Sequence, residues 1–105
     1  MTEAKERLLP LQGIRIVDWT TAQTGPSATQ LLADMGADVI KVESPKGGDM
    51  SRSATKDAGK WLTLPHGLPY HFENLNRNKR SLSVDIAKEE GKKIVYSLVA
   101  KSDVF

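Results

Sequence analysis

The sequence has no cysteine among its 105 residues. This absence excludes a disulfide framework, a thiolate metal site and a cysteine nucleophile, and it fits a reducing compartment. Long apolar runs are also missing, since none approaches the roughly 20 residues that a helix needs to cross a bilayer. Residues 8–11 (Leu-Leu-Pro-Leu) are too short for the apolar part of a signal peptide. We therefore expect no membrane association and a cytoplasmic location.

An excess of either charge is lacking too, because 15 Lys and Arg face 13 Asp and Glu for a net charge of +2. Aromatic residues make up only 6% of the chain, which is few for a base-stacking surface. The basic run at residues 76–80, Asn-Arg-Asn-Lys-Arg, has no second basic patch to support it. We expect no nucleic-acid partner and interpret the run as a solvated turn, with a small anionic ligand as the alternative.

Groups with recognisable catalytic or metal-binding spacing are also scarce. His66 and His71 stand in an irregular segment without a carboxylate or thiolate pattern beside them, so no metal site is predicted. No nucleophile stands in a recognisable relation to a base. Asp18 follows an apolar run but lacks the acidic pair of a phosphoacceptor site, and a hydrogen-bonding role is expected for it. These residues alone predict no catalytic centre.

What the sequence does contain is the pattern of an α/β protein with a parallel sheet. Residues 14–18 and 37–43 are rich in branched apolar side chains and predict two strands. Between them, Pro26 suits the first turn of a helix and Gly36 suits its end. The expected buried stripe of this helix is Ala28, Leu31, Leu32 and Met35. Residues 14–43 therefore predict a βαβ unit.

The second half of the chain predicts an irregular excursion and then a strand–helix pair. Proline and glycine punctuate residues 44–75, with a short helix expected over 70–75. Residues 81–101 predict a strand and then a helix that starts near Glu89. The expected strand side chains are Leu82, Val84 and Ile86, and the expected buried helix face is Ala87, Gly91, Ile94, Val95, Leu98 and Val99.

Residues 102–105 repeat the pattern that opens the second predicted strand. A central strand cut short leaves backbone groups unpaired. We therefore expect residues 1–105 to be part of one larger domain.

Ligands of open parallel sheets bind beyond the carboxyl ends of the strands. Here that region comprises residues 20–25, residues 44–48 and the segment after Asp85. A dinucleotide site of the usual kind is not predicted, because the first of these loops has one glycine in place of Gly-x-Gly-x-x-Gly. Gln23 and Thr24 are candidate ligand contacts, with a solvated turn and helix cap as the alternative.

Several segments, in order and with matching spacing, resemble the N-terminal part of the family III CoA-transferases. The family includes formyl-CoA and carnitine CoA-transferases and the α-methylacyl-CoA racemases. The resemblance covers about residues 9–105. The segments that carry it are residues 11–18 (Leu-Gln-Gly-Ile-Arg-Ile-Val-Asp), Gly25-Pro26, residues 32–43, residues 47–52 (Gly-Gly-Asp-Met-Ser-Arg) and residues 76–81 (Asn-Arg-Asn-Lys-Arg-Ser).

This resemblance implies a Rossmann-like large domain in an interlocked homodimer, with acyl-CoA and a carboxylic acid as substrates. In such transferases an aspartate attacks the acyl-CoA thioester to give a mixed anhydride. The CoA thiolate then forms an aspartyl-CoA thioester, from which the acceptor carboxylate collects CoA. That aspartate corresponds to a position beyond Phe105, so no catalytic residue is assigned within the chain.

The resemblance also implies which residues contact CoA. Gln23 and Thr24 match the loop at the thioester end, and a glutamine there resembles the formyl-CoA and oxalate type more than the racemase type. Ser44 and Ala87 stand where relatives often have arginine and lysine, and Lys46 and Lys88 could replace those cations. The segment that resembles the adenosine site is Val84, Asp85, Ile86 and Ala87. The alternatives are the racemase branch, which exchanges a proton next to the thioester, and a non-catalytic CoA- or nucleotide-binding module.

Overall fold

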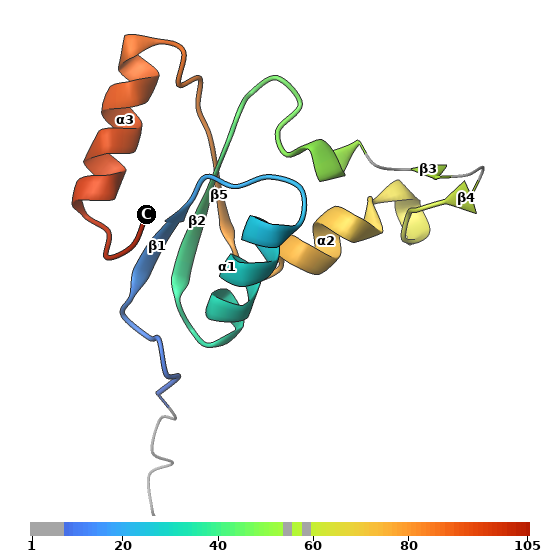
Figure 1. Cartoon of the computed structure of the whole chain (residues 1–105), viewed down its shortest axis with the longest axis horizontal. Coiled ribbons are helices and arrows are strands. Elements are labelled where there is room, and N and C mark those ends of the chain that lie inside the picture. Colours follow the sequence, from blue (N-terminus) through green and yellow to red (C-terminus); the bar gives the residue numbers. More distant parts are fainter. Residues whose placement is uncertain (1–7, 54–55, 58–59) are drawn as a thin grey trace, which may run out of the picture.

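The computed structural model describes residues 8–53, 56–57 and 60–105. At its centre lies a parallel sheet of three strands, β1 (Arg15–Asp18), β2 (Asp38–Glu43) and β5 (Arg80–Ser83), in the order β1-β2-β5 (Figure 1). The predicted α/β architecture with a parallel sheet is thus confirmed.

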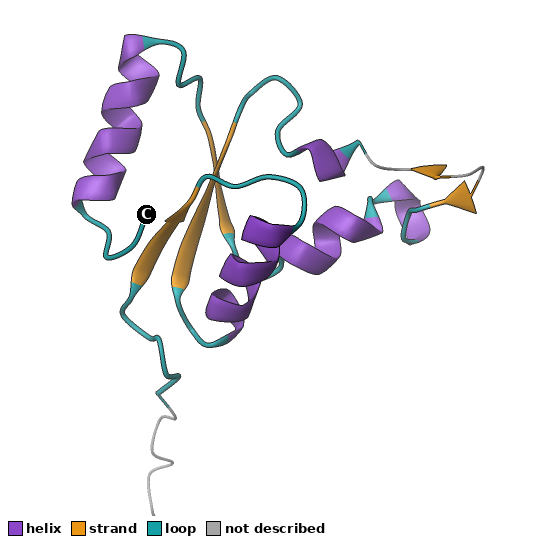
Figure 2. Cartoon of the chain, viewed as in Figure 1, coloured by secondary structure: helices purple, strands orange, loops and turns teal. Residues whose placement is uncertain are grey.

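Helices cover the two faces of this sheet (Figure 2). Helix α1 (Thr24–Asp34) packs on one face, where Ile16 and Val39 form a core with Ala33 and Ala37. Helix α3 (Glu89–Ala100) packs on the other. There the core consists of Val17, Val42, Val84 and Val95. Because neighbouring residues of a strand point to opposite faces, β1 contributes Ile16 to one core and Val17 to the other.

The excursion between β2 and β5 extends away from the sheet (Figure 1). It contains two short 3-10 helices, η1 (Met50–Arg52) and η2 (Pro65–Gly67), with helix α2 (Tyr70–Asn76) at its end. Between η1 and η2, strands β3 (Lys56–Asp57) and β4 (Lys60–Trp61) pair antiparallel. Helix α2 contacts both α1 and η1, so the end of the excursion returns to the sheet beside α1.

The predicted buried stripe of α1 is wrong at three of its four positions, whereas the fourth, Leu32, packs against the core. Leu31 and Met35 are 63% and 40% exposed, and Ala28 is exposed as well. The helix is rotated so that its buried residues are Pro26, Gln30 and Ala33. The Nε2 of the buried Gln30 donates to Asp34 Oδ1 at 2.9 Å, while its Oε1 has no hydrogen-bond partner among the described residues. This rotation brings the Pro26 end of the helix over the buried polar groups described below.

The strand–helix pair also departs in detail from its prediction. β5 ends at Ser83, opposite Glu43, where β2 ends as well. Val84 still donates its N–H to the Glu43 carbonyl at 3.0 Å, and the chain then turns toward α3. Gly91 packs so closely on this turn that a Cβ there would overlap the Asp85 carbonyl. Ile94, expected on the buried face of α3, is 50% exposed.

The last residues lie beside β1, on the side opposite β2. Val104 forms a parallel bridge with Ile16, and its carbonyl accepts the N–H of Val17 at 2.9 Å. The Trp19 and Phe105 rings stack with centroids 6.4 Å apart. Within the described residues, no helix has the length and apolar character that a membrane crossing requires.

Candidate functional site

A cleft opens beyond the carboxyl ends of β2 and β5, with a volume of about 290 Å³. We call it the β2–β5 cleft. Its wall residues are Trp19, Val42, Glu43, Ser44, Lys46, Val84, Asp85, Ile86 and Ala87. Apolar side chains share this wall with polar and charged ones, a mixture that suits an amphipathic ligand.

Most of the residues proposed from the sequence to contact a ligand meet in this cleft. Those in its wall are Ser44, Lys46, Val84, Asp85, Ile86 and Ala87. Gln23 and Thr24 are exposed at the start of α1, and Lys88 is exposed just before α3. None of these three is among the residues that line the cleft. Of the two candidate cations, Lys46 therefore lines the cleft and Lys88 does not.

Trp19 belongs to the cleft wall, although no sequence pattern assigned it a binding role. It follows directly on β1 and is 52% exposed. An aromatic residue immediately after a strand of a parallel sheet is a signal that could have singled it out, because that is where ligands bind.

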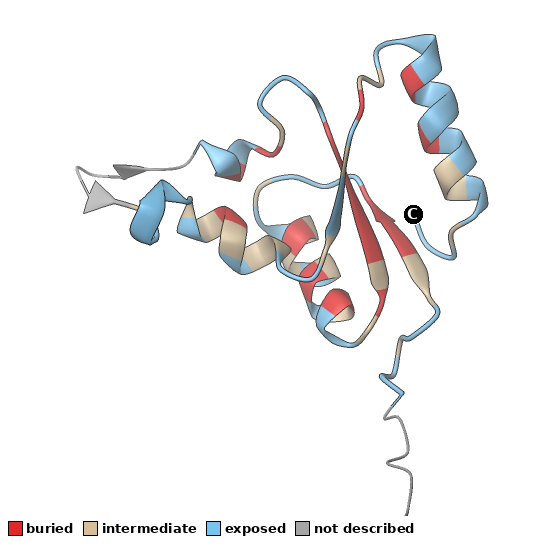
Figure 3. Ribbon diagram, turned by 180° about the vertical axis from the view of Figure 1, so that it is seen from behind, coloured by how far each residue is buried: buried red, intermediate tan, exposed pale blue. Residues whose placement is uncertain are grey.

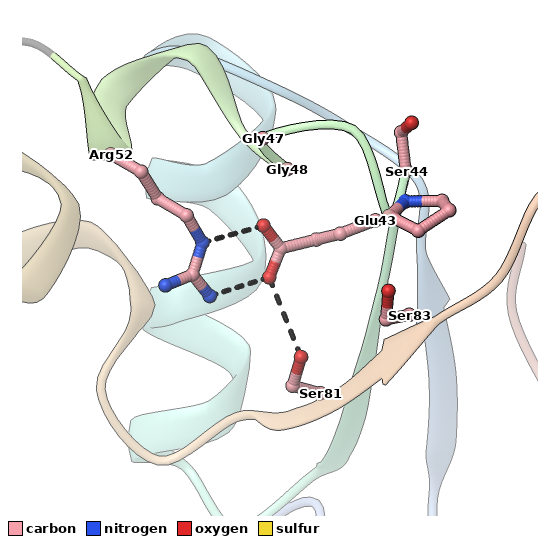
Figure 4. Close-up of a pocket in the computed structure, with 8 residues that line it drawn as sticks. Glu43, Ser44, Gly47, Gly48, Arg52, Ser81 and Ser83 are labelled. Carbon is pink, nitrogen blue, oxygen red and sulfur yellow. Dashed lines mark hydrogen bonds and ion pairs between the residues drawn. The ribbon is translucent and has the colours of Figure 1, made fainter.

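A smaller polar hollow of about 200 Å³ adjoins the cleft and is organised by Glu43 (Figure 4). Arg52 donates to both oxygens of the Glu43 carboxylate at 2.7 Å. These bonds outweigh the effect of burial and hold the pKa of Glu43 below its usual range. The Arg52 guanidinium also lies 3.8 Å from the centre of the Phe72 ring. Glu43 is thus held as an ionised partner of Arg52.

A fully buried ion pair joins β2 to the loop after it. Lys41 Nζ lies 2.8 Å from Asp49 Oδ2, and the two side chains are 2% and 0% exposed. Burial alone would raise the pKa of Asp49, but bonds from Lys41, Ser51 and the Ala22 N–H lower it far below its usual range. In the sequence, Lys41 interrupts an apolar strand, which is the one local sign of this pair.

A second fully buried pair links Asp18, at the end of β1, to Lys79. Their side chains are 0% and 2% exposed, and Lys79 Nζ donates to Asp18 Oδ2 at 3.0 Å. Burial opposes ionisation of Asp18, but hydrogen bonds from Thr20, Thr29 and Lys79 prevail and lower its pKa. The predicted hydrogen-bonding role of Asp18 is confirmed.

The interpretation of residues 76–80 as a solvated turn is wrong for Lys79. Its ammonium group is buried and also donates to the Asn76 side chain and the Pro26 carbonyl. Arg77 and Arg80 pair instead with Asp34 and Asp38 at 2.9 and 2.7 Å. Each of these three cations therefore forms an ion pair with an aspartate of the chain.

These networks converge on the loop of residues 20–23, which joins β1 to α1. Lys41 Nζ donates to the Thr20 carbonyl, and Ala22 donates its N–H to Asp49 Oδ1. Ala22 has a φ of 70°, a left-handed conformation that is uncommon outside glycine. Such conformations persist where the surrounding structure enforces them, often at functional sites.

Acid is expected to destabilise the chain through these carboxylates. Asp18, Glu43 and Asp49 all have pKa values below their ordinary ones in the folded state. Their contribution to stability is therefore complete above the ordinary values of 3.8 and 4.5 and declines as the pH falls below them. Urea denaturation at pH 7, 5 and 3.5 should show a loss below about pH 5 that Asp18→Asn makes shallower. Equal stability at pH 7 and pH 3.5 would contradict the ionised network.

Three acidic or histidine side chains that could together hold a metal ion do not occur within the described ranges 8–53, 56–57 and 60–105. Among the residues described, the cleft wall offers hydrogen-bonding groups, the Lys46 ammonium, the carboxylates of Glu43 and Asp85, and apolar side chains.

A parallel sheet with helices on both faces and a cleft beyond its strand ends places the chain in the α/β class, in which ligands commonly bind at that edge of the sheet. Residues 11–105 match the family model for CoA-transferase family III, and the chain belongs to that family.

Curated relatives with this match include formyl-CoA:oxalate CoA-transferases of three bacteria. The protein of Bradyrhizobium sp. is 45% identical over 94 residues, and that of Streptomyces coelicolor is 47% identical over 94. The Escherichia coli O6:H1 protein is 42% identical over 95 residues. In each case the match covers 90% of this chain and 21% of the relative. The chain thus spans about a fifth of the length of these relatives.

Solved structures support the fold. A hypothetical protein from Mycobacterium tuberculosis superposes with a TM-score of 0.77 at 38% identity, covering 91% of this chain and 24% of that one. A CaiB/BaiF family protein from Brucella suis also gives 0.77 at 38% identity, covering 93% and 25%.

Proposed function

We propose that this chain supplies part of the CoA-binding site of an enzyme that moves CoA from an acyl-CoA to a carboxylic acid. The observation that carries the proposal is the β2–β5 cleft. It gathers six of the residues proposed from the sequence for CoA contact, and it lies where parallel sheets bind ligands. The relatives named formyl-CoA:oxalate CoA-transferase favour transfer over racemisation.

In this proposal the two ends of CoA meet different parts of the chain. The adenosine end lies along residues 84–87, whose backbone turns sharply because Ala87 donates its N–H to Asp85 Oδ1 at 3.0 Å. The thioester end lies near Gln23 and Thr24, at the start of α1. The first N–H groups of a helix have no partner within it, so this end offers hydrogen-bond donors to a polar ligand.

Chemistry follows the family mechanism in this proposal. An aspartate carboxylate contributed by sequence that corresponds to the rest of the relatives attacks the thioester carbonyl, and the CoA thiolate leaves as the anhydride forms. The thiolate then displaces the donor carboxylate to give the aspartyl-CoA thioester. Attack by the acceptor carboxylate on this thioester forms a second mixed anhydride and releases the thiolate. The thiolate then attacks the acceptor carbonyl, which gives the new acyl-CoA and frees the aspartate carboxylate. We also propose that the enzyme is a cytoplasmic, interlocked homodimer.

The decisive experiment is expression of the chain from its own reading frame, with any sequence that follows Phe105. The protein is incubated with formyl-CoA and oxalate, and thioesters are followed by mass spectrometry. Appearance of oxalyl-CoA, or of another acyl-CoA when other pairs are tried, supports the proposal. Deuterium uptake next to the thioester without transfer would assign the racemase branch instead. CoA binding without either reaction would assign a non-catalytic module, and absence of CoA binding would overturn the cleft assignment.

Lys46 is the cation expected to meet the CoA phosphates. It lines the β2–β5 cleft, whereas Lys88 does not. A charge-assisted hydrogen bond is worth about 1.5–3 kcal/mol, so Lys46→Ala should weaken CoA binding about tenfold in calorimetry. Lys88→Ala is the matched control and should change the Kd less than about twofold. Equal effects of the two variants, or none from Lys46→Ala, would contradict this assignment.

A further inference from the structure

We propose that Lys41 and Asp49 are positioning residues: their buried ion pair sets the conformation of residues 20–23 and so places Gln23 at the reacting end of CoA. The functional half of this inference rests on the proposed function, since it takes Gln23 to meet the thioester. The structural half, that the pair fixes the loop, stands on the contacts alone.

The pair is well placed to act at a distance from the ligand. Lys41 belongs to β2, and Asp49 precedes η1, where its side chain accepts the Ser51 N–H at 2.9 Å and caps the short helix. Asp49 is anchored in turn by its own N–H, which donates to Glu43 Oε2 at 2.8 Å. A side chain held at so many points has little freedom, so the groups bonded to it are fixed as well.

Successive residues of the loop are tied to this pair and the turn that carries it. Lys41 Nζ donates to the Thr20 carbonyl at 3.0 Å, and the Met50 N–H donates to Thr21 Oγ1 at 3.3 Å. The Ala22 N–H donates to Asp49 Oδ1 at 3.1 Å. This last bond holds Ala22 in the left-handed conformation that directs the chain into Gln23. Without an acceptor at that point, a non-glycine residue favours right-handed or extended backbone.

The other buried pair does not hold the loop in this way. Asp18 accepts the Thr20 N–H at 2.9 Å, and thereby fixes only the first loop residue. Its remaining bonds come from the hydroxyl of the same Thr20, from Thr29 in α1 and from Lys79 before β5. Loss of the Lys41–Asp49 pair should therefore release Ala22 and Gln23 while the β1 end of the loop stays in place.

Asp49→Ala removes the acceptor of Ala22 and the partner of Lys41. Hydrogen exchange followed by mass spectrometry should show faster exchange in the peptide that contains Ala22. In the expressed enzyme, kcat should fall about 10- to 100-fold, the range expected for misplaced reacting groups. The Kd for free CoA should change little, because the adenosine end binds in the β2–β5 cleft.

A conservative and a matched variant separate positioning from plain loss of stability. Asp49→Asn keeps an oxygen for the Ala22 N–H and should restore part of kcat. Val39→Ala, also in β2 and 1% exposed, destabilises the core far from the loop. At matched residual stability it should leave both kcat and Ala22 exchange unchanged. If Asp49→Ala does not fold, Thr21→Val removes only the acceptor of the Met50 N–H and should lower kcat more than Val39→Ala does.

Unchanged exchange at Ala22 in Asp49→Ala would overturn the inference, as would equal losses of kcat in Asp49→Ala and Val39→Ala. The proposed function fails in a different way, through a wild-type protein that neither binds nor transfers CoA. In that event faster Ala22 exchange in Asp49→Ala would still support the structural half, and unchanged exchange would refute it.

Discussion

Lys79→Met is expected to lower the free energy of unfolding by about 3–5 kcal/mol, the usual loss when one partner of a buried ion pair is removed. Methionine has nearly the length of lysine but cannot donate to Asp18, Asn76 or the Pro26 carbonyl. The Asp18 carboxylate, itself 0% exposed, would lose its only cationic partner within the described residues. Because Lys79 joins β1, α1 and α2, the loss should affect the whole fold. Urea denaturation measures it.

Two comparisons test the cause of that loss. Lys92→Met breaks an exposed pair with Glu89, whose side chains are 45% and 78% exposed. It should change stability by no more than about 0.5 kcal/mol. The double variant Asp18→Asn/Lys79→Met removes both buried charges and should recover part of the stability. A loss below about 1 kcal/mol in Lys79→Met would show that the pair contributes little.

Phe72→Ala is the second large effect, with an expected loss of about 3–5 kcal/mol. Phe72 is the buried residue of α2 and is 8% exposed. Its ring supports the Arg52 guanidinium that neutralises Glu43. In Figure 3 most of the α2 ribbon is intermediate or exposed, with a buried portion facing the rest of the fold. Alanine would leave a cavity between α2 and η1 and would release Arg52 from the ring. Thermal and urea unfolding both report the loss.

The neighbouring Tyr70 supplies the control for this variant. It lies in the same helix but is 43% exposed, so Tyr70→Ala should cost far less than Phe72→Ala. Phe72→Leu keeps an apolar side chain without the aromatic face and should fall between the two. If Phe72→Ala cost no more than Tyr70→Ala, the packing of α2 on η1 would not hold the Glu43 hollow together.

Local patterns were enough to predict the strands of the central sheet and the three α-helices, but not the short strands and 3-10 helices of the excursion. Branched runs predicted β1 and β2, and Pro26 and Gly36 correctly bracketed α1, because each signal lies within a few residues of the feature it sets. The buried face of α1 was missed. Which side of an amphipathic helix is covered depends on its neighbours, here α2 and the end of β1, and not on its own periodicity alone.

The buried ion pairs were beyond the reach of sequence patterns for the same reason. Asp18 and Lys79 are 61 residues apart, so no local pattern identifies them as partners. Lys79 was therefore interpreted as part of a solvated turn. Lys41 in an apolar strand was visible, but its partner Asp49 was not. Most of the cleft residues could be predicted because they follow predicted strands, and the topology of a parallel sheet brings the ends of its strands together.

Buried polar side chains form a layer beneath two surface loops, and we call this layer the polar floor. Three buried carboxylates, each paired with a cation, fix the carboxyl ends of β1 and β2. Above them lie the β2–β5 cleft and the start of α1, which we propose to bind the two ends of CoA. Such a floor keeps binding groups in place without contributing to the reaction itself.

The proposed CoA site is tested most directly by hydrogen exchange of the protein expressed from its own reading frame, measured with and without bound CoA. We expect bound CoA to slow exchange in peptides that contain residues 84–87 and 20–24, whereas exchange in peptides from within α3 should stay unchanged. CoA that binds tightly yet leaves both of these segments unprotected would place the cofactor elsewhere and contradict the account.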